Sequence, residues 1–245
     1  MQKVTVTALP ALGKRTVNTF LLRGDRPVLV DAGVPGSGPR ILEQVVALGV
    51  SPTDLAAIVI THGHIDHFGS AVFLRQATGA PIIAHSADLA SYRLGRNGGP
   101  LPPTGPLGWL FGKTPVPHAH TEPFEPQVII DGPTALHDYG VAARILPSPG
   151  HTPGSVSVLT DDGDLIAADL IAGRFLGLFE APANPPFHED RLQNLASIDS
   201  MLEQGATTLY VGHGAPLDAD RVRRWARREH RRTRSARCPW PITRE

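Results

Sequence analysis

The amino-acid sequence predicts a mixed α/β (α+β) fold in which two β-sheets lie between layers of helices. Short β-type runs recur along the whole chain, and stretches with helical spacing separate several of them. Mixing in both halves favours sheets covered by helices over an all-β fold. The 245 residues, 41% of them hydrophobic and 19% charged, are typical of a globular protein with one large core. We therefore expect a single domain spanning residues 1–245.

The expected strands are short apolar runs bounded by turn-forming residues. They are Val4–Val6, Thr19–Leu22, Val28–Val30, Ala57–Ile60, Pro81–Ala84, Val128–Ile130, Ala142–Leu146, Ser155–Leu159, Leu165–Ala168 and Leu209–Val211. Helical spacing occurs over Ile41–Leu48, Ala71–Ala77, Ser86–Leu94, Asp190–Leu202 and Asp220–Arg232. The first helical stretch stops at Gly49, and glycine commonly follows the end of a helix.

The segment 95–126 interrupts this alternation. It holds eight prolines and six glycines, with Trp109, Leu110 and Phe111 near its middle. Loops of this length without regular structure are usually functional or disordered. We interpret the segment as an insertion that is either a lid over the site or a loop with no catalytic role. An apolar lid would suit an acyl or ring group on the substrate.

Charge is distributed unevenly, although the formal net charge is zero. Residues 221–245 hold ten arginines against Glu229 and Glu245, whereas residues 1–220 hold thirteen basic and twenty-one acidic side chains. The basic helix or tail at about 220–245 is either a footprint for nucleic acid or membrane, or the solvated face of a terminal helix. We favour the solvated face and do not expect nucleic acid as a partner.

The remaining composition suggests the compartment. Cys238 is the only cysteine, which excludes an intramolecular disulfide and argues against a thiolate metal site. No stretch approaches the roughly 18 apolar residues that span a bilayer, so no membrane contact is expected. The first twenty residues lack an apolar run followed by a small-residue cleavage site. We expect a cytoplasmic enzyme that acts on a small molecule.

The densest cluster of potential ligands follows the strand expected at Ala57–Ile60. Thr61-His62-Gly63-His64-Ile65-Asp66-His67 places four potential ligands in six positions. His62 and His64 lie two residues apart, so an extended segment points both to one side. Asp66 and His67 follow as the chain enters a helix expected at Ser70–Thr78. The cluster predicts a metal site, because imidazole and carboxylate are ligands of zinc.

Further candidate ligands come later, each at the end of an expected strand. His151 lies in Pro149-Gly150-His151-Thr152-Pro153-Gly154, Asp169 follows Leu165–Ala168, and His213 follows Leu209–Val211. One loop cannot surround two metal ions, so other loops must contribute. Loops at one edge of rigid sheets are a usual place for a pre-formed site.

The motif at residues 62–67, followed in order by His151, Asp169 and His213, resembles the metallo-β-lactamase superfamily. Pro27-Val28-Leu29-Val30-Asp31-Ala32-Gly33 is similar to the family's early strand and turn. The resemblance covers about residues 17–214 and implies an αββα four-layer sandwich with a dinuclear site along one edge. Ala168 is a departure, because family members commonly have glycine before the bridging aspartate.

The resemblance also implies a role for each matching residue. The first metal ion would be bound by His62, His64 and His151. The second would be bound by Asp66, His67 and His213, and Asp169 would bridge both. Two divalent ions are implied, most simply zinc, with iron or manganese as alternatives. Asp31 would either support the histidine loop by hydrogen bonding or act only as a turn residue.

Such a site favours hydrolysis. Bound zinc lowers the pKa of its water from about 16 to about 7, which supplies hydroxide at neutral pH. This hydroxide would attack the carbonyl of a small-molecule ester, lactone or thioester, and a metal ion would polarise the carbonyl. Asp66 is the expected catalytic residue, because it can accept or orient the proton of the nucleophile.

Differences between this sequence and family members of known activity narrow the range of expected substrates. True β-lactamases generally lack the bridging aspartate, present here as Asp169. Glyoxalase-II-like thioesterases have the full ligand set, but Leu170–Glu180 has no match to their basic glutathione-binding residues. Quorum-signal lactonases commonly have tyrosine three residues after the bridging aspartate, where this chain has Ala172. The candidates for a substitute donor are Tyr92, Tyr139 and His188.

The other histidines outside the motif receive lesser roles. His188 is expected to line the pocket, and His85 is expected at the sheet edge near the site without binding metal. His118 and His120 have a metal-like spacing, but they lie in the insertion without strand support. We expect them to be exposed loop residues.

Three alternative functions use different features. A phosphodiesterase of the nuclease type would fit the arginine-rich end, but no further nucleic-acid motif is present. A persulfide dioxygenase-like oxidoreductase with one iron ion would leave Asp66, His67 and His213 without a metal. A non-catalytic metal protein is disfavoured, since structural zinc sites are closed and usually rich in cysteine.

Overall fold

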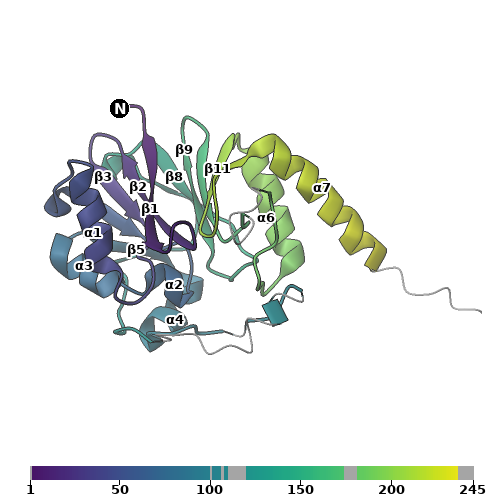
Figure 1. Ribbon diagram of the computed structural model, residues 1–245, viewed down its shortest axis with the longest axis horizontal. Helices are drawn as coiled ribbons and strands as arrows, with labels where there is room; N and C mark the ends of the chain where they lie inside the picture. The colour runs from purple at the N-terminus through teal and green to yellow at the C-terminus, as the bar shows by residue number, and fades with distance from the viewer. Residues whose placement is uncertain (1, 100, 106–107, 110–119, 174–180, 237–245) are drawn as a thin grey trace, which may run out of the picture.

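The computed structural model describes residues 2–99, 101–105, 108–109, 120–173 and 181–236. Two six-stranded sheets face each other, and helices cover the outer face of each (Figure 1). The layers therefore follow the order helix, sheet, sheet, helix, as the resemblance implies. The predicted fold class is confirmed.

The first sheet has its strands in sequence order. They are β1 (Thr5–Leu12), β2 (Val17–Arg23), β3 (Pro27–Val30), β4 (Ala57–Val59), β5 (Ile82–His85) and β6 (Val128–Ile130). The first three strands pair antiparallel, and β3 to β6 pair parallel. The parallel strands end at the same edge of the sheet, so the loop after β4 emerges at that edge.

The second sheet runs β12-β11-β10-β9-β8-β7. Its strands are β7 (Thr134–Ala135), β8 (Ala143–Pro147), β9 (Val156–Thr160), β10 (Asp164–Ala168), β11 (Thr208–Val211) and β12 (Leu217–Asp218). Neighbouring strands pair antiparallel except β10 and β11, which pair parallel. The ends of β10 and β11 therefore also share one edge.

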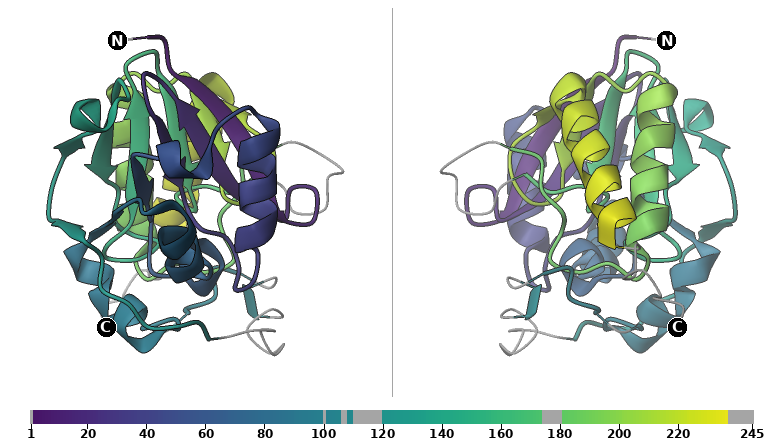
Figure 2. Two further views of the ribbon diagram at one scale, coloured as in Figure 1. Left: turned by 90° about the vertical axis from the view of Figure 1, so that its left-hand side faces the viewer. Right: turned by 90° about the vertical axis from the view of Figure 1, so that its right-hand side faces the viewer.

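The helices divide between the two outer faces. They are α1 (Gly38–Ala47), α2 (Ile65–Phe68), α3 (Ala71–Thr78), α4 (Leu89–Leu94), α6 (Arg191–Glu203) and α7 (Ala219–Ala236). Short 3₁₀ turns are η1 (Pro52–Asp54), η2 (Ser86–Asp88) and η3 (His137–Tyr139). Helices α1 and α3 pack on the first sheet, and α6 and α7 lie side by side on the second (Figure 2).

Alternating side chains of each strand fill different layers. Leu21 and Leu29 point toward α1 and α3, whereas Phe20, Leu22 and Val28 face the second sheet. This two-residue period is the geometry of an extended strand with both faces covered. The resulting three apolar layers hold the two sheets at fixed positions, and with them the loops at the sheet edges.

All ten predicted strands are present, and their ends agree within two residues except that β1 runs six residues beyond the predicted end at Val6. Strands β7 and β12 were not predicted, because two-residue strands carry no periodicity. The prediction was wrong about one helix: Asp66 and His67 lie in a separate short helix, α2, and not at the entry to α3. Gly69 and Ser70 separate the two helices, which lets the chain change direction after the histidine motif.

Helix α7 presents arginine to solvent. Its buried side includes Val222, Ala226 and Glu229, and every exposed side chain from residue 221 to residue 232 is an arginine. This agrees with the solvated face favoured by the sequence. None of the helices in the described ranges is long and apolar enough for a transmembrane span.

Candidate metal centre

The candidate ligands come together at one edge of the two sheets. The loop after β4 and the short helix α2 that follows it carry His62, His64, Asp66 and His67, and the loops after β8, β10 and β11 carry His151, Asp169 and His213. Their ligand atoms form three overlapping groups, within each of which all atoms lie within 4.8 Å of one another. The structure thus brings all seven predicted ligands to one place.

The first group consists of His62, His64 and His151, called here the histidine group. The ring of His62 lies 4.8 Å from that of His64 and 4.7 Å from that of His151, measured between centroids. Nε2 of His151 lies 2.9 Å from Nδ1 of His64. Three imidazole nitrogens that converge in this way are a typical first half of a zinc site.

The second group consists of Asp66, His67 and His213, called here the mixed group. Oδ2 of Asp66 lies 3.3 Å from Nε2 of His213 and 3.9 Å from Nε2 of His67. The Asp66 side chain is 32% exposed, whereas that of His67 is fully buried. Asp66 is therefore the most exposed member of this group.

Asp169 lies between the two groups. Its Oδ1 is 3.5 Å from Nε2 of His67, and its Oδ2 is 3.1 Å from Nε2 of His213 and 3.6 Å from Nε2 of His151. A single carboxylate therefore touches both groups. Gly212 permits this approach, because a Cβ at that position would lie 2.3 Å from Oδ1 of Asp169.

Four of the five histidines have Nδ1 hydrogen-bonded away from the cluster. The partners are Oγ1 of Thr61 for His62, Oδ2 of Asp31 for His67, the carbonyl of Phe187 for His151 and the carbonyl of Thr16 for His213. A carbonyl or carboxylate only accepts, so Nδ1 carries the proton and Nε2 keeps its lone pair. The Thr61 hydroxyl donates to Asp31, so it accepts from His62, and the proton of His62 is therefore also on Nδ1.

Unpartnered buried atoms test whether a cation fits. Nε2 of His62, Nε2 of His67 and Oδ1 of Asp169 are buried and have no hydrogen-bond partner in the described part of the chain. Each faces the cluster, and a buried polar atom without a partner costs about 1–3 kcal/mol. Metal coordination would satisfy all three, and the imidazole and carboxylate donors suit zinc, iron or manganese. The residues therefore fit a divalent metal.

Electrostatics differ between the two groups. Burial, together with His67 and His151, holds the pKa of His62 well below its usual value, and burial with His64 does the same for His151. Burial also opposes protonation of His213, but Asp169 and Asp66 outweigh it and raise the pKa of His213 to about 10. The carboxylates thus stabilise positive charge beside them, whether a proton on a histidine or a bound cation supplies it.

Asp31 supports the histidine motif by accepting three hydrogen bonds. Its Oδ1 accepts from the backbone N–H of Thr61 at 2.8 Å, and its Oδ2 accepts from the Thr61 hydroxyl at 3.0 Å and from Nδ1 of His67 at 2.7 Å. Asp31 is fully buried and has a positive φ of 66°. Asp31 therefore makes the hydrogen bonds that the supporting role requires, and its positive φ also fits the turn role.

Asp88 and Asn18 also hydrogen-bond to the ligand loops, and neither residue was predicted from the sequence. Asp88 accepts from the N–H of Gly63 at 2.7 Å, the hydroxyl of Thr152 at 2.7 Å and the N–H of Gly154 at 2.9 Å, so it joins two ligand loops. Asn18 donates through Nδ2 to the carbonyls of residues 211 and 214, on either side of His213. Their only sequence signal was a polar residue beside an apolar run.

The remaining predicted residues lie in varied places. His188 is buried beside His151, with ring centroids 6.0 Å apart, and burial followed by Arg191 lowers its pKa to about 4. Tyr92 packs in the core between Phe68 and Phe124, so it does not serve as a substrate donor.

The other residues singled out in the sequence lie farther from the cluster or in the insertion. Nδ1 of His85 accepts from the N–H of residue 87 and thereby begins η2, and Tyr139 belongs to η3. His120 is exposed, as expected. Trp109 is 57% exposed, while His118, Leu110 and Phe111 lie outside the described residues, so the lid remains a prediction.

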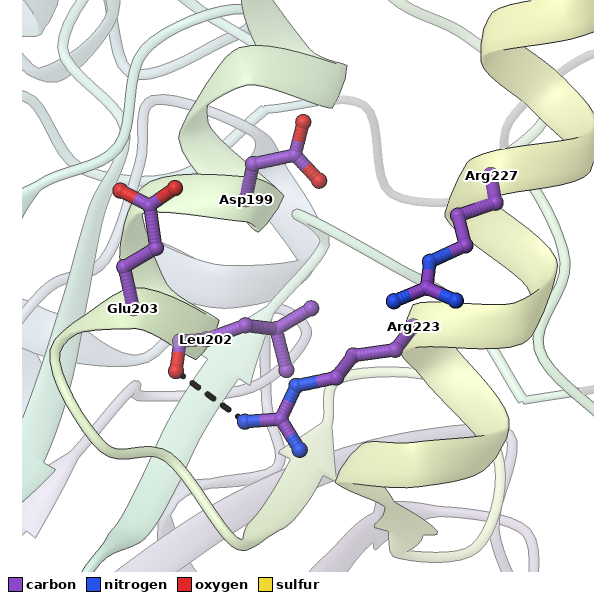
Figure 3. A pocket seen from close by; sticks show the side chains of 5 residues that line it. All are labelled: Asp199, Leu202, Glu203, Arg223 and Arg227. Atoms are coloured by element: carbon purple, nitrogen blue, oxygen red, sulfur yellow. Dashed lines mark hydrogen bonds between the residues drawn. The ribbon is translucent and has the colours of Figure 1, made fainter.

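A separate open pocket lies between α6 and α7 (Figure 3). Its lining places Asp199 and Glu203 opposite Arg223 and Arg227, and Arg223 donates to the carbonyl of Leu202 at 3.2 Å. None of these residues belongs to the metal cluster. The carboxylates and guanidinium groups offset one another's charge, so this pocket is a feature of helix packing.

Comparisons with known proteins agree with this geometry. The sequence model of the metallo-beta-lactamase superfamily matches residues 12–213. The probable metallo-hydrolase YflN of Bacillus subtilis is 26% identical, with 80% of this chain and 78% of YflN covered. The hydroxyacylglutathione hydrolase of Anaeromyxobacter dehalogenans is 29% identical, with 78% of this chain and 60% of that protein covered.

A solved structure shares the fold. The metallo-beta-lactamase family protein TTHA1429 from Thermus thermophilus superimposes with a TM-score of 0.67 at 22% identity, covering 95% of this chain and 81% of that one. The family match spans more than half of the chain and includes every candidate ligand. The chain therefore belongs to the metallo-β-lactamase superfamily and is a metal-dependent hydrolase.

Proposed function

We propose that this hydrolase uses two divalent metal ions, preferably zinc, to cleave a small-molecule ester, lactone or thioester. The observation that carries the proposal is the position of Asp169, whose two oxygens reach both the histidine group and the mixed group. One ion would leave one of the two groups without a partner. Two ions sharing Asp169 would use all seven side chains.

In this proposal the histidine group holds one ion, the mixed group holds the other, and Asp169 contributes to both. Bound ions of this kind polarise a carbonyl and lower the pKa of water, so that a nucleophile exists at neutral pH. In the neutral rings of His62, His67, His151 and His213, the Nδ1 hydrogen bonds leave the lone pair on Nε2, where a metal ion would take the place of a second proton. The protein therefore needs little rearrangement to bind the ions.

Asp66 is the proposed catalytic residue. Burial raises its pKa, but His67 and His213 outweigh burial and hold the pKa well below the usual range. The carboxylate is therefore ionised at neutral pH, and a carboxylate of low pKa is a weak base. We infer that Asp66 accepts a hydrogen bond from the attacking water and orients it. Its partly exposed side chain allows this contact.

A thioester is the first substrate class to test, because a hydroxyacylglutathione hydrolase is among the relatives. That relative extends beyond the matched region, since only 60% of it is covered. Because Leu170–Glu180 shows no match in sequence to the basic glutathione-binding residues of such thioesterases, simple esters and lactones are equal candidates. Carbonyl chemistry is common to all three classes.

The deciding experiment combines metal analysis with a hydrolysis screen. The purified protein should contain about two zinc-like ions per chain, and it should hydrolyse at least one of a glutathione thioester, an aryl ester or a lactone. His62→Ala should lose metal and activity, whereas His120→Ala, an exposed control histidine, should keep both. One iron ion without zinc would contradict the proposal in favour of an oxygenase. Exclusive cleavage of bis-nitrophenyl phosphate would indicate a phosphodiesterase.

A further inference from the structure

The loop before α6 lies directly against the His151 loop. The carbonyl of Phe187 accepts from Nδ1 of His151 at 3.0 Å, and the N–H groups of Glu189 and Asp190 donate to the carbonyls of His151 and Gly150 at 3.2 and 2.8 Å. The same loop is held at its base, where buried Glu229 of α7 accepts from Asn184 and Arg191. Its position relative to the metal cluster is therefore set from both sides.

His188 stands on this loop with one ring nitrogen unused. The residue is 5% exposed, and its ring is nearly perpendicular to that of His151, at an interplanar angle of 86°. Nε2 is buried and has no hydrogen-bond partner among the described residues. His188 belongs to none of the metal-binding groups found in that part of the chain. A polar atom buried without a partner beside a reactive centre is poised to bind a ligand.

The other nitrogen of His188 is held by the insertion. Nδ1 of His188 lies 2.7 Å from Oγ1 of Thr104. The backbones of the two segments also pair: the N–H of Thr104 donates to the carbonyl of Pro186 at 2.8 Å, and the N–H of His188 donates to the carbonyl of Pro102 at 3.2 Å. The insertion segment therefore fixes both the backbone and the ring of His188.

The partner at Nδ1 distinguishes His188 from His67, His151 and His213, and it differs from the Thr61 hydroxyl at His62, which donates to Asp31. Carbonyl or carboxylate acceptors at the ligand histidines force the proton onto Nδ1. A threonine hydroxyl can instead donate to Nδ1, which places the proton on Nε2. His188 would then carry an N–H at its buried Nε2, where the ligand histidines carry lone pairs.

We propose that Nε2–H of His188 donates a hydrogen bond to the carbonyl oxygen of the substrate, or to the carboxylate of the product, and that Thr104 positions the ring by donating to Nδ1. The inference rests on the proposed function because it assumes that a carbonyl group binds beside the metal cluster. His188 acts on the substrate directly, and Thr104 acts only through His188.

Three variants test the two roles. His188→Phe keeps a planar ring without nitrogen, Thr104→Val keeps the shape of threonine without its hydroxyl, and Thr104→Ser restores the hydroxyl. With 4-nitrophenyl acetate as the probe, His188→Phe should lower kcat/KM about 10–100-fold and Thr104→Val about 10-fold, as expected for a lost hydrogen bond. Thr104→Ser should stay within about twofold of the wild type, and all three should keep the wild-type metal content.

A second readout does not depend on turnover. Ring ¹⁵N NMR of the zinc-loaded protein should place the His188 proton on Nε2 in the wild type and in Thr104→Ser, and should redistribute it in Thr104→Val. Acetate, used as a product analogue, should shift this N–H resonance, and it should bind about tenfold more weakly to His188→Phe. Because neither measurement requires hydrolysis, both still decide the inference if no ester is cleaved and the proposed function fails.

Opposite outcomes would overturn the inference. A proton on Nδ1 in the wild type, or acetate binding that is unchanged in His188→Phe, would show that Nε2 does not donate to the ligand. A His188 tautomer unaffected by Thr104→Val would remove the positioning role of Thr104. Equal kinetic loss in Thr104→Ser and Thr104→Val would point to backbone packing of the insertion in place of its hydroxyl.

Discussion

Two regions supply the metal cluster, and they are held in different ways. The first histidine loop, residues 61–69, is fixed mainly by the buried carboxylates of Asp31 and Asp88. The later ligand loops, which carry His151, Asp169 and His213, are fixed mainly by neutral groups: main-chain carbonyls and the Asn18 amide. Asp88 also reaches the His151 loop and thus connects the two regions.

Charged and neutral supports affect the ligands differently. A carboxylate that accepts from a ligand histidine orients the ring and also raises its basicity, whereas a carbonyl orients it with no added charge. Losing a buried carboxylate leaves several donors unpaired, but losing one neutral amide leaves two carbonyls that accept other partners more easily. We therefore expect the first histidine loop to be the more sensitive region.

The largest effect is expected at Asp169, which belongs to the later ligand loops and also lies beside His67 of the first histidine loop. Asp169→Asn removes the charge between the two groups, so kcat/KM should fall at least about 100-fold, more than the loss typical of a residue outside the ligand set. Elemental analysis should find fewer ions per chain. Asp162→Asn, an exposed aspartate in the turn before β10, is the matched control and should retain both activity and metal. Full metal content in Asp169→Asn would contradict the bridging position.

Asp31→Ala should be the most destabilising change outside the ligand set. It leaves the Thr61 N–H and Nδ1 of His67 without their acceptor. The free energy of unfolding of the metal-free protein should fall by about 3 kcal/mol, and metal affinity should fall about 10–100-fold. Urea denaturation and chelator competition measure the two effects. Asp54→Ala, at the exposed turn η1, should change neither.

Asn18→Ala sharpens the comparison, because it removes the neutral support of the later ligand loops. Two hydrogen bonds to the carbonyls beside His213 are lost, and the free energy of unfolding should fall by about 1–2 kcal/mol. The same denaturation experiment applies. A loss as large as that of Asp31→Ala would mean that charge does not distinguish the two regions.

The smallest effect is expected from Ala168→Gly. Ala168 has a positive φ of 44°, a left-handed conformation that costs a residue with a Cβ about 1–2 kcal/mol. Glycine relieves this cost but loses more backbone entropy on folding, so a net gain in stability of about 0.5 kcal/mol is expected. Ala167→Gly, one residue earlier in β10, has no such strain to relieve and should lose stability. Destabilisation by both variants would contradict the account of Ala168.

The two regions also differ in how well the sequence predicted them. His62, His64, Asp66 and His67 stand together after an apolar strand, so local spacing was enough to recognise them. The later ligands were assigned through resemblance to a family, since a single histidine or aspartate after a strand is common. The lid over the site and the single-domain organisation remain predictions.

The sequence by itself determined the layered fold, the ten main strands and the candidate ligands at residues 62–67, because these depend on periodicity and on one short motif. Tertiary structure decided which atom of each ligand faces the cluster. Thr16 lies 197 residues from His213, and Asp31 lies 36 residues from His67, yet each fixes the proton on that histidine's Nδ1. Thr16 and His213 meet only when the two sheets pack, and Asp31 and His67 meet only when β3 pairs with β4, so no local pattern records either pair.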